Sequence, residues 1–279
     1  MSRYIPGLGK INSLEIKRII THGAFLQVED EEVLLPRKFT PDSAKEGDFI
    51  NVFLYTDSED RPVATTQVPK GELGSIVALT VVDLTNFGAF LDWGLDKHLF
   101  VPNSEMEADM KVGMVYPVKI VLDHRTNRLI GVNKLRPFLT PAENIAQGDK
   151  VESLIINQTP LGYKAVVNGK HEGLIYKNET FQTVNIGDSI ITYVQQVRDD
   201  GKLDLRLSPT GMDGLSITKK KVVEYLRHHQ GESQLNDKSP PELIKSTLQM
   251  SKKAFKRAIG SLYKEKRIDL EDNKIRLLD

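Results

Sequence analysis

Glycine spacing repeats three times along this chain of 279 residues, and it restricts the possible fold more than any other feature. In each repeat, two glycines lie 14 residues apart and a third follows after a further 24 or 25 residues. The three sets are Gly9, Gly23 and Gly47; Gly74, Gly88 and Gly113; and Gly148, Gly162 and Gly187. The last glycine of each set precedes a strand-like run: DFINVFLY, MVYPVKIV or DSIITYVQ. This self-similarity predicts three copies of one module.

Each copy consists of short strand-like runs separated by Gly, Asp and Asn turns, without a long helical pattern. About five strands in a module of this length are typical of a small barrel of the oligonucleotide/oligosaccharide-binding type. We therefore predict a mostly β chain with three tandem five-stranded barrels at residues 1–69, 70–138 and 139–210. In such a barrel, one outer face built mainly from the second and third strands is a binding surface.

The C-terminal residues 211–279 differ from the rest in charge and in pattern. They hold 15 Lys and Arg against 10 Asp and Glu, whereas the whole chain has 38 of each and a net charge of zero. A linker at residues 209–214 is predicted to precede three helices. Two short runs, RIDLE and KIRLL, then predict a hairpin around Asp272 and Asn273. Three helices and a β-wing make a small α+β domain, a winged helix-turn-helix.

The three predicted helices each have a boundary signal and an apolar face. The first, TKKKVVEYLRHHQG, ends just before Gly231. In SPPELIKSTLQ, Ser239 is expected to cap the helix and Glu242 to complete a capping box. Ser251 is expected to cap the third, KKAFKRAIGSLYKEKR. The positions predicted to face the core are Val222, Val223, Leu226, Ala254, Phe255, Ala258 and Leu262.

Composition excludes several classes of protein. No run of about 18 apolar residues occurs, so no segment is predicted to span a membrane. The first residues, MSRYIPGLGK, lack an apolar signal segment, so we expect a cytoplasmic protein. The chain has no cysteine, which excludes disulfides and thiolate chemistry. No GxxxxGK[ST], HExxH or GxSxG motif occurs, so we expect no enzyme activity, no catalytic residue, no cofactor and no metal site.

The segment 83–102, DLTNFGAFLDWGLDKHLFVP, places aromatic rings on the outside of the second predicted barrel. Strand alternation turns Ala89 and Leu91 towards the core, which leaves Phe90 facing outward. Phe87 flanks the same Gly-Ala pair. Exposed rings on a barrel face offer single-stranded bases a stacking surface. The alternative is that these rings pack against a neighbouring module.

The stretch GSIVALTVVDLTNFGAFLDW resembles the S1 RNA-binding motif, whose second strand carries FGAF followed by an apolar residue. The first copy, HGAFLQV, keeps three of those four letters, and the third, LGYKAVV, keeps only the glycine and an aromatic residue. Three such modules followed by a basic helical domain resemble the conserved virulence factor B family. The most specific match is NDKSPPELIKSTLQMSKKAFKRAIGSLYKEKRI, and the resemblance covers essentially the whole chain. It implies binding of single-stranded RNA.

The resemblance also implies which residues of the barrels face the RNA. The S1 face usually carries a His on its third strand, a place that we assign to Leu35, Val101 and Tyr176 in the three copies. It also carries an Asp and a basic residue near the fourth hairpin, matched by Asp57 with Arg61 and, loosely, by Asp123 with Arg128. The predicted RNA-binding residues of the barrels are His22, Phe25, Arg61, Phe87, Phe90, His98, Arg128, Tyr163, Lys170 and Tyr176. No copy has the complete set, so we expect the modules to act together along one strand.

Charge indicates that the barrels do not act alone. The predicted barrels carry net charges of −3, 0 and −2, so phosphate contacts there depend on a few cations such as Arg125, Arg128 and Lys170. In a winged helix the third helix reaches a nucleic-acid groove. Its predicted contacts are Lys252, Lys253, Lys256 and Arg257. A lysine-rich helix is also common as a solvated face. Nothing in this helix resembles a base-reading set of Asn, Gln and Arg, which favours phosphate contact without sequence preference.

Three classes of function remain open. The first is a single-stranded RNA-binding protein that regulates transcript stability or translation, with the ribosome or the RNA-decay machinery as further partners. The second is a DNA-binding transcription regulator that uses the winged helix on duplex DNA, with the barrels as interaction modules. The third is a structural adaptor on a ribosome or nuclease. No membrane partner is expected.

Overall fold

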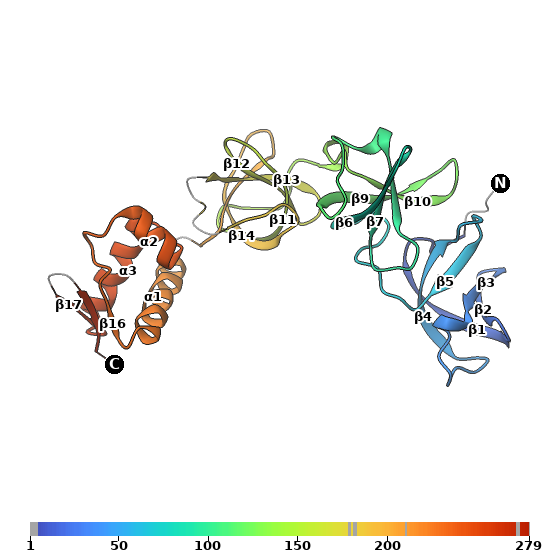
Figure 1. Cartoon of the computed structure of the whole chain (residues 1–279), viewed down its shortest axis with the longest axis horizontal. Helices are drawn as coiled ribbons and strands as arrows, with labels where there is room; N and C mark the ends of the chain where they lie inside the picture. Colours follow the sequence, from blue (N-terminus) through green and yellow to red (C-terminus); the bar gives the residue numbers. More distant parts are fainter. Residues whose placement is uncertain (1–4, 178–179, 181–182, 210, 272–273, 279) are drawn as a thin grey trace. The chain divides into compact units, whose positions relative to one another are not determined.

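A computed structural model describes residues 5–177, 180, 183–209, 211–271 and 274–278 (Figure 1). The chain is mostly β, as predicted, with its α-helices confined to the C-terminal residues. Its contacts divide it into two compact units. The first comprises residues 1–139 with 186–188, and the second comprises residues 140–185 with 189–279.

Five strands close the first barrel in the order β1-β2-β3-β5-β4. Their bounds are β1 Ile11–Ile20, β2 Gly23–Val28, β3 Glu31–Pro36, β4 Phe49–Thr56 and β5 Pro62–Thr65, with the short 3-10 helix η1 at Arg37–Phe39. Neighbouring strands are antiparallel, except that β3 and β5 run parallel. Alternate residues such as Ile16, Leu26 and Leu35 fill the interior. Closure of the barrel removes the free edges of the sheet.

The second barrel, also in the first unit, closes in the order β10-β8-β7-β6-β9. Its elements are β6 Ile76–Thr85, β7 Gly88–Asp92, β8 Leu99–Pro102, η2 Asn103–Glu105, β9 Val115–Asp123, β10 Arg128–Val132 and η3 Arg136–Phe138. Ala89 and Leu91 are fully buried, which confirms the predicted alternation. The Trp93 ring meets Phe53 of the first barrel edge to face, with centroids 5.5 Å apart. The two barrels therefore share one apolar cluster.

A third closed barrel, in the order β11-β12-β13-β15-β14, lies in the second unit. Its strands are β11 Lys150–Gln158, β12 Gly162–Val167, β13 His171–Tyr176, β14 Ser189–Val197 and β15 Leu203–Arg206. Ile155, Ala165 and Ile175 lie in its core. The connectivity is the same as in the first barrel: the fifth strand in sequence lies beside the third, and the fourth closes the barrel against the first.

The first strand of every barrel is irregular at the same place. The pairing with the second strand skips one residue, which is Lys17 in β1, Val82 in β6 and Ile156 in β11. Such a bulge bends the strand and turns the following side chain to the other face. The residues that follow the bulge are Arg18, Asp83 and Asn157. These three positions are therefore structurally equivalent.

The glycine that begins the second strand of each barrel is required by a close backbone approach. A Cβ atom at Gly88 would lie 2.2 Å from the carbonyl oxygen of Val101. At Gly23 and Gly162 the corresponding distance to a backbone carbonyl oxygen is 2.0 Å. Because side chains do not approach backbone oxygens this closely, only glycine fits.

We expect Gly88→Ala to lower the free energy of unfolding by about 2 kcal/mol or more, because the strand pair must shift to admit the methyl group. Urea unfolding followed by fluorescence of Trp93, the only tryptophan, measures this loss. Gly260→Ala in helix α3 (Lys252–Lys264) is the control, since a Cβ there meets nothing within 4 Å. That change should be neutral or stabilising by up to about 1 kcal/mol. Equal stability of Gly88→Ala and wild type would contradict the account of this glycine.

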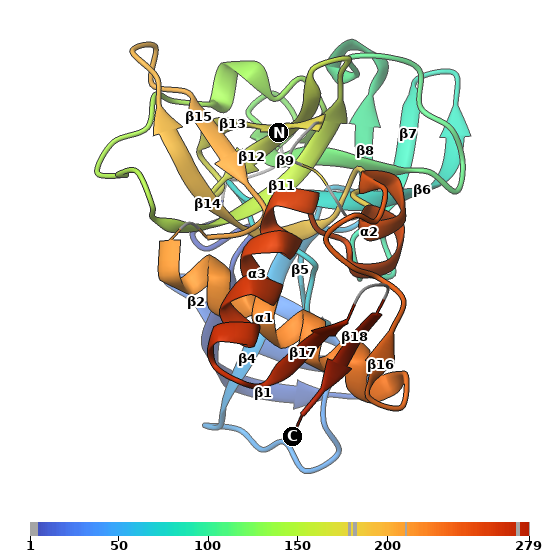
Figure 2. The same cartoon turned by 90° about the vertical axis from the view of Figure 1, so that its left-hand side faces the viewer.

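The C-terminal residues form three helices and a small sheet of order β16-β18-β17, with the β17–β18 hairpin beside α1 and α3 (Figure 2). The bounds are α1 Gly211–His228, β16 Glu232–Ser233, α2 Pro241–Leu248, α3 Lys252–Lys264, β17 Ile268–Glu271 and β18 Lys274–Leu277. All predicted core positions lie in or against one apolar cluster, with only Ala254 partly exposed. Strand β16 was not predicted, and the predicted turn at Asp272 and Asn273 lies outside the described residues. Among the described helices, none is long and apolar enough to cross a membrane.

The predicted linker at 209–214 is wrong in part, because α1 begins at Gly211. Two glycines in its first turn favoured a linker, since glycine costs about 1 kcal/mol in a helix interior. At a helix start this cost is smaller, because the first four N–H groups have no helical partner in any case. The helix continues into residues whose side chains support it: the Thr218 hydroxyl donates to the carbonyl oxygens of Gly214 and Leu215, both at 3.0 Å.

The predicted cap of α2 is also wrong, whereas the predicted cap of α3 is confirmed. Pro240 occupies the N-cap of α2 without a side-chain hydrogen bond. The Ser239 hydroxyl instead accepts a hydrogen bond from the Asn236 N–H at 2.9 Å, which closes the preceding turn. At α3, the Ser251 hydroxyl accepts from the Ala254 N–H at 3.1 Å.

Candidate nucleic-acid interface

Three phenylalanine rings lie on the outer face of the second barrel. Phe87, in the turn before β7, is 79% exposed, more than any other large apolar side chain in the described part of the chain. Phe90 on β7 and Phe100 on β8 are cross-strand partners with ring centroids 5.1 Å apart. Both are half-buried, and Phe90 faces outward as predicted. We call Phe87, Phe90 and Phe100 the aromatic face of the second barrel.

Phe100 was not among the predicted residues, because Val101 was assigned to the outward position of the third strand. That placement is wrong, because Val101 pairs with Ala89 and is fully buried. Leu35 of the first barrel is likewise buried opposite Ala24. In LFVP, the alternation of Leu99 and Val101 was the signal that would have turned Phe100 outward.

In the first barrel, Phe25 is covered by an arginine. Arg18 is its cross-strand partner, and the guanidinium carbon lies 3.8 Å from the ring centroid. Glu32 holds the guanidinium in place by accepting from Nη2 at 2.8 Å and from Nε at 3.1 Å. A stacked cation of this kind contributes about 0.5–1 kcal/mol at an exposed site. His22, at the place of Phe87, is exposed.

The third barrel has no outward ring at the place of Phe90. Its register matches Tyr163 to Ala89, and Tyr163 is half-buried against the barrel core. The outward position belongs to Lys164, whose Nζ lies 3.8 Å from Glu172. Tyr176 does not take the place of Val101 as predicted, because Ile175 does. The bulge in β11 and the pairing of β12 with β13 fix this register, which the letters LGYKAVV alone did not show.

Tyr176 instead belongs to a polar cluster in the third barrel. Its hydroxyl accepts a hydrogen bond from Arg198 Nη2 at 3.1 Å. Arg198 Nε also donates to Asp204 at 3.0 Å, and this hydrogen bond raises the pKa of Arg198. The cluster of Tyr176, Arg198 and Asp204 was not predicted, since its members come from three different strands or turns.

The two predicted arginines of the hairpins, Arg61 and Arg128, each form an ion pair with a carboxylate, so neither is a free cation. Arg61 Nη2 lies 2.7 Å from Asp57 Oδ2 in the β4–β5 turn. Burial alone would raise the pKa of Asp57, but the hydrogen bonds from Arg61 and the neighbouring backbone lower it. In the second barrel, Arg128 Nη2 donates to Asp60 of the first barrel at 2.8 Å. These arginines must leave or share a carboxylate before they contact phosphate.

We expect Asp60→Asn to remove a pH-dependent part of stability. The hydrogen bond from Arg128 lowers the pKa of Asp60 in the folded protein. The contribution is therefore present above the ordinary carboxyl pKa of about 3.9 and is lost as the pH falls through the lowered value. Wild type should melt slightly above Asp60→Asn at neutral pH, and the two should converge once the pH is below the lowered pKa of Asp60. A melting difference of the same size at both pH values would contradict the pairing.

The remaining predicted barrel contacts, His98 and Lys170, are exposed. His98 directly precedes β8 and follows Lys97, whose Nζ donates to the carbonyl oxygens of Thr56 and Asp57 at 2.7 Å. Burial lowers the pKa of Lys97. This lysine therefore joins the first two barrels, and the exposed His98 ring lies next to that junction.

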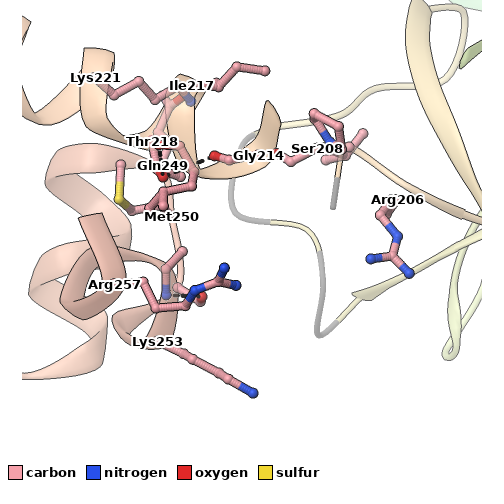
Figure 3. Close-up of a pocket in the computed structure, with 15 residues that line it drawn as sticks. Arg206, Ser208, Gly214, Ile217, Thr218, Lys221, Gln249, Met250, Lys253 and Arg257 are labelled. Carbon is pink, nitrogen blue, oxygen red and sulfur yellow. Dashed lines mark hydrogen bonds between the residues drawn. The ribbon is translucent and has the colours of Figure 1, made fainter. Parts of the chain in front are cut away.

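The predicted cations of α3 lie on the first turns of the helix. Lys253, Lys256 and Arg257 are exposed and Lys252 is half-buried, with its Nζ 3.4 Å from the Lys238 carbonyl oxygen. Lys253 and Arg257 help to line a pocket of about 430 Å³, and their side chains extend away from the helices (Figure 3). Backbone N–H groups at a helix start attract anions, so this end of α3 is favourable for phosphate.

The site contains no arrangement that points to metal chemistry. Within the residues that the structure describes, no group of three or more His, Asp or Glu side chains is placed to hold a metal ion. What the geometry offers is a set of exposed rings on a closed barrel and a basic helix end. Tandem barrels of this kind with a winged helix define a modular nucleic-acid-binding protein.

Comparison with known proteins agrees with a modular nucleic-acid-binding protein and identifies the types of its domains. Residues 8–67 and 73–130 match the S1 domain, and residues 220–277 match the CvfB-like winged helix domain. The chain is 27% identical over 281 residues to YitL of Bacillus subtilis (strain 168), covering 95% of this chain and 91% of that protein. It is 26% identical over 251 residues to conserved virulence factor B of Staphylococcus aureus (strain USA300), covering 85% and 81%. The chain thus combines S1 domains with a CvfB-like winged helix domain, and it resembles YitL and conserved virulence factor B over most of its length.

A solved structure of a multidomain protein with nucleic acid binding domains from Streptococcus pneumoniae TIGR4 also aligns with the chain. The alignment covers 98% of this chain and 99% of that chain, with 23% sequence identity and a TM-score of 0.47. The S1 match ends at residue 130, so it covers the first two barrels but not the third.

Proposed function

We propose that this protein binds single-stranded RNA and regulates gene expression after transcription, in the cytoplasm. The observation that carries the proposal is the aromatic face of the second barrel, Phe87, Phe90 and Phe100. Unpaired bases stack on such rings with about 1–3 kcal/mol each, whereas bases inside a duplex are already stacked. The zero net charge of residues 70–138 is consistent with binding through stacking rather than through a broad basic field.

The winged helix supplies the positive charge that the barrels lack. Residues 211–279 carry a net charge of +5, and four of these cations lie on the first turns of α3. Lysine contacts phosphate as a point charge and reads base edges poorly, so this helix adds affinity for any strand. The third barrel is a further S1-like module in the proposed RNA binding. Its outward Lys164 contacts the phosphate backbone of the RNA rather than a base.

The winged helix also favours a second candidate, a DNA-binding regulator, because exposed cations on the third helix are what a groove-binding winged helix needs. Competition binding separates the two. A labelled single-stranded RNA of about 12 nucleotides, within the span of such barrels, is bound and then competed with unlabelled RNA strand, duplex RNA and duplex DNA. The RNA proposal predicts that the single strand competes best. Stronger competition by duplex DNA would favour the DNA-binding regulator.

A further inference from the structure

The three barrels differ at the residue that lies opposite the outward position of the second strand. Arg18 lies opposite Phe25, Asp83 opposite Phe90, and Asn157 opposite Lys164. Because these positions follow the same bulge, each side chain rises on the same outer face as the ring or lysine beside it. One barrel thus places a pure donor, one a pure acceptor and one an amide next to its binding surface.

Asp83 is placed to contact a base that stacks on the aromatic face. Directly opposed residues of antiparallel strands have Cβ atoms roughly 4.5–5.5 Å apart, so the carboxylate stands beside the Phe90 ring. The side chain is exposed. One oxygen, Oδ1, accepts from the Leu84 N–H at 2.8 Å, which orients the group. Within the described residues, the Asp83 side chain makes no other hydrogen bond or ion pair, so Oδ2 is open to a ligand.

An ionised carboxylate accepts hydrogen bonds and donates none. Guanine presents two adjacent donors on its Watson–Crick edge, N1–H and the 2-amino group, which match the two oxygens of a carboxylate. Uracil presents one donor between two carbonyl oxygens, and those oxygens would face the negative charge. We propose, resting on the proposed binding of RNA, that Asp83 makes the aromatic face of the second barrel selective for guanine.

The first barrel is a natural contrast within the same chain. At the equivalent position, the Arg18 guanidinium lies over Phe25 and is held by Glu32, so the ring is covered and the exposed edge donates hydrogen bonds. At this equivalent position, the second barrel has a carboxylate, whereas the first has Arg18 and the third has Asn157. The preference is therefore a property of Asp83 and not of every module.

The test uses the full chain and three single-stranded RNAs of about 12 nucleotides, a length within the binding span of such barrels. All are uridine strands that carry one central guanosine, inosine or adenosine. Inosine keeps N1–H but lacks the 2-amino group. Asp83→Asn is the variant, because asparagine has the same shape and can still accept from Leu84. Asp109→Asn is the matched control, since Asp109 is an exposed carboxylate of the same barrel outside β6, β7 and β8.

Wild type and Asp109→Asn should bind the guanosine strand about fivefold or more tighter than the inosine strand, since one bidentate pair gives discrimination of this order. In Asp83→Asn the ratio should fall to near one, because the guanosine strand loses the hydrogen bonds from N1–H and the 2-amino group, whereas the inosine strand loses only the one from N1–H. An unchanged ratio in Asp83→Asn, or no preference in wild type, would overturn the guanine inference while leaving RNA binding intact. Failure of wild type to bind any of the three strands would overturn the proposed function as well.

Discussion

Replacing Phe87 and Phe90 together by alanine is expected to weaken the binding of single-stranded RNA by at least about 2 kcal/mol, or roughly 30-fold. Each stacked base contributes about 1–3 kcal/mol, and both rings belong to the aromatic face of the second barrel. Phe87 is 79% exposed, so its loss should hardly change the melting temperature. Phe90 also contacts Phe100, which adds a small loss of stability. Affinity by fluorescence anisotropy and melting by circular dichroism measure the two effects.

Phe49→Ala is the matched control for this change. Phe49 is another exposed ring, at 71%, but it begins β4, which pairs with β1 and β5 and not with the second or third strand of its barrel. Its removal should leave RNA affinity unchanged. A large drop in melting temperature with unchanged affinity in the double variant would show that Phe87 and Phe90 are packing residues, and the S1-type use of this face would then be wrong.

The second large effect is expected on α3. Changing Lys252, Lys253, Lys256 and Arg257 to alanine should weaken binding to unrelated single-stranded RNAs by similar factors, because phosphate contacts do not depend on sequence. Each lost contact should also reduce the slope of log affinity against log salt by about 0.7. Binding measured at several salt concentrations for at least two RNA sequences tests both points. The control removes four other exposed lysines, from the barrels: Lys45, Lys111, Lys150 and Lys177.

That control should change the affinity and the salt slope less than the α3 variant does. Equal losses in the two variants would mean that α3 acts only through the net charge of the chain. A loss that depends strongly on the RNA sequence would contradict a phosphate-contacting helix. A reproducible motif from a selection of random duplex DNA with the intact protein would favour the DNA-binding candidate instead.

Much of the fold was predictable because it depends on short-range sequence signals. Glycine spacing and strand turns predicted closed barrels, and the structure shows why the spacing holds: a side chain at Gly88 would meet the Val101 carbonyl oxygen. Alternation along β7 predicted the outward orientation of Phe90, and the core faces of α1 and α3 followed from helical periodicity. The start of α1 was missed because glycine is only a weak helix breaker at a helix end.

The site was less predictable because it depends on how strands pair. The inward place of Tyr163 follows from cross-strand register, which short motifs do not specify. The outward place of Phe100 was missed although the alternation of Leu99 and Val101 indicated it. The pairing of Arg128 with Asp60 joins residues 68 positions apart in sequence. Charged groups that looked available to phosphate in the sequence are therefore partly used within the fold.

The most direct test of RNA binding by the aromatic face is photochemical crosslinking of a single-stranded RNA to the full chain, followed by mass spectrometry of tryptic peptides. If the aromatic face binds RNA, the major adducts will lie on the peptides 71–97 and 98–111, which carry Phe87, Phe90 and Phe100. Adducts should disappear from these peptides in the double alanine variant. Crosslinks confined to other parts of the chain, with none on these two peptides, would contradict RNA binding by the aromatic face.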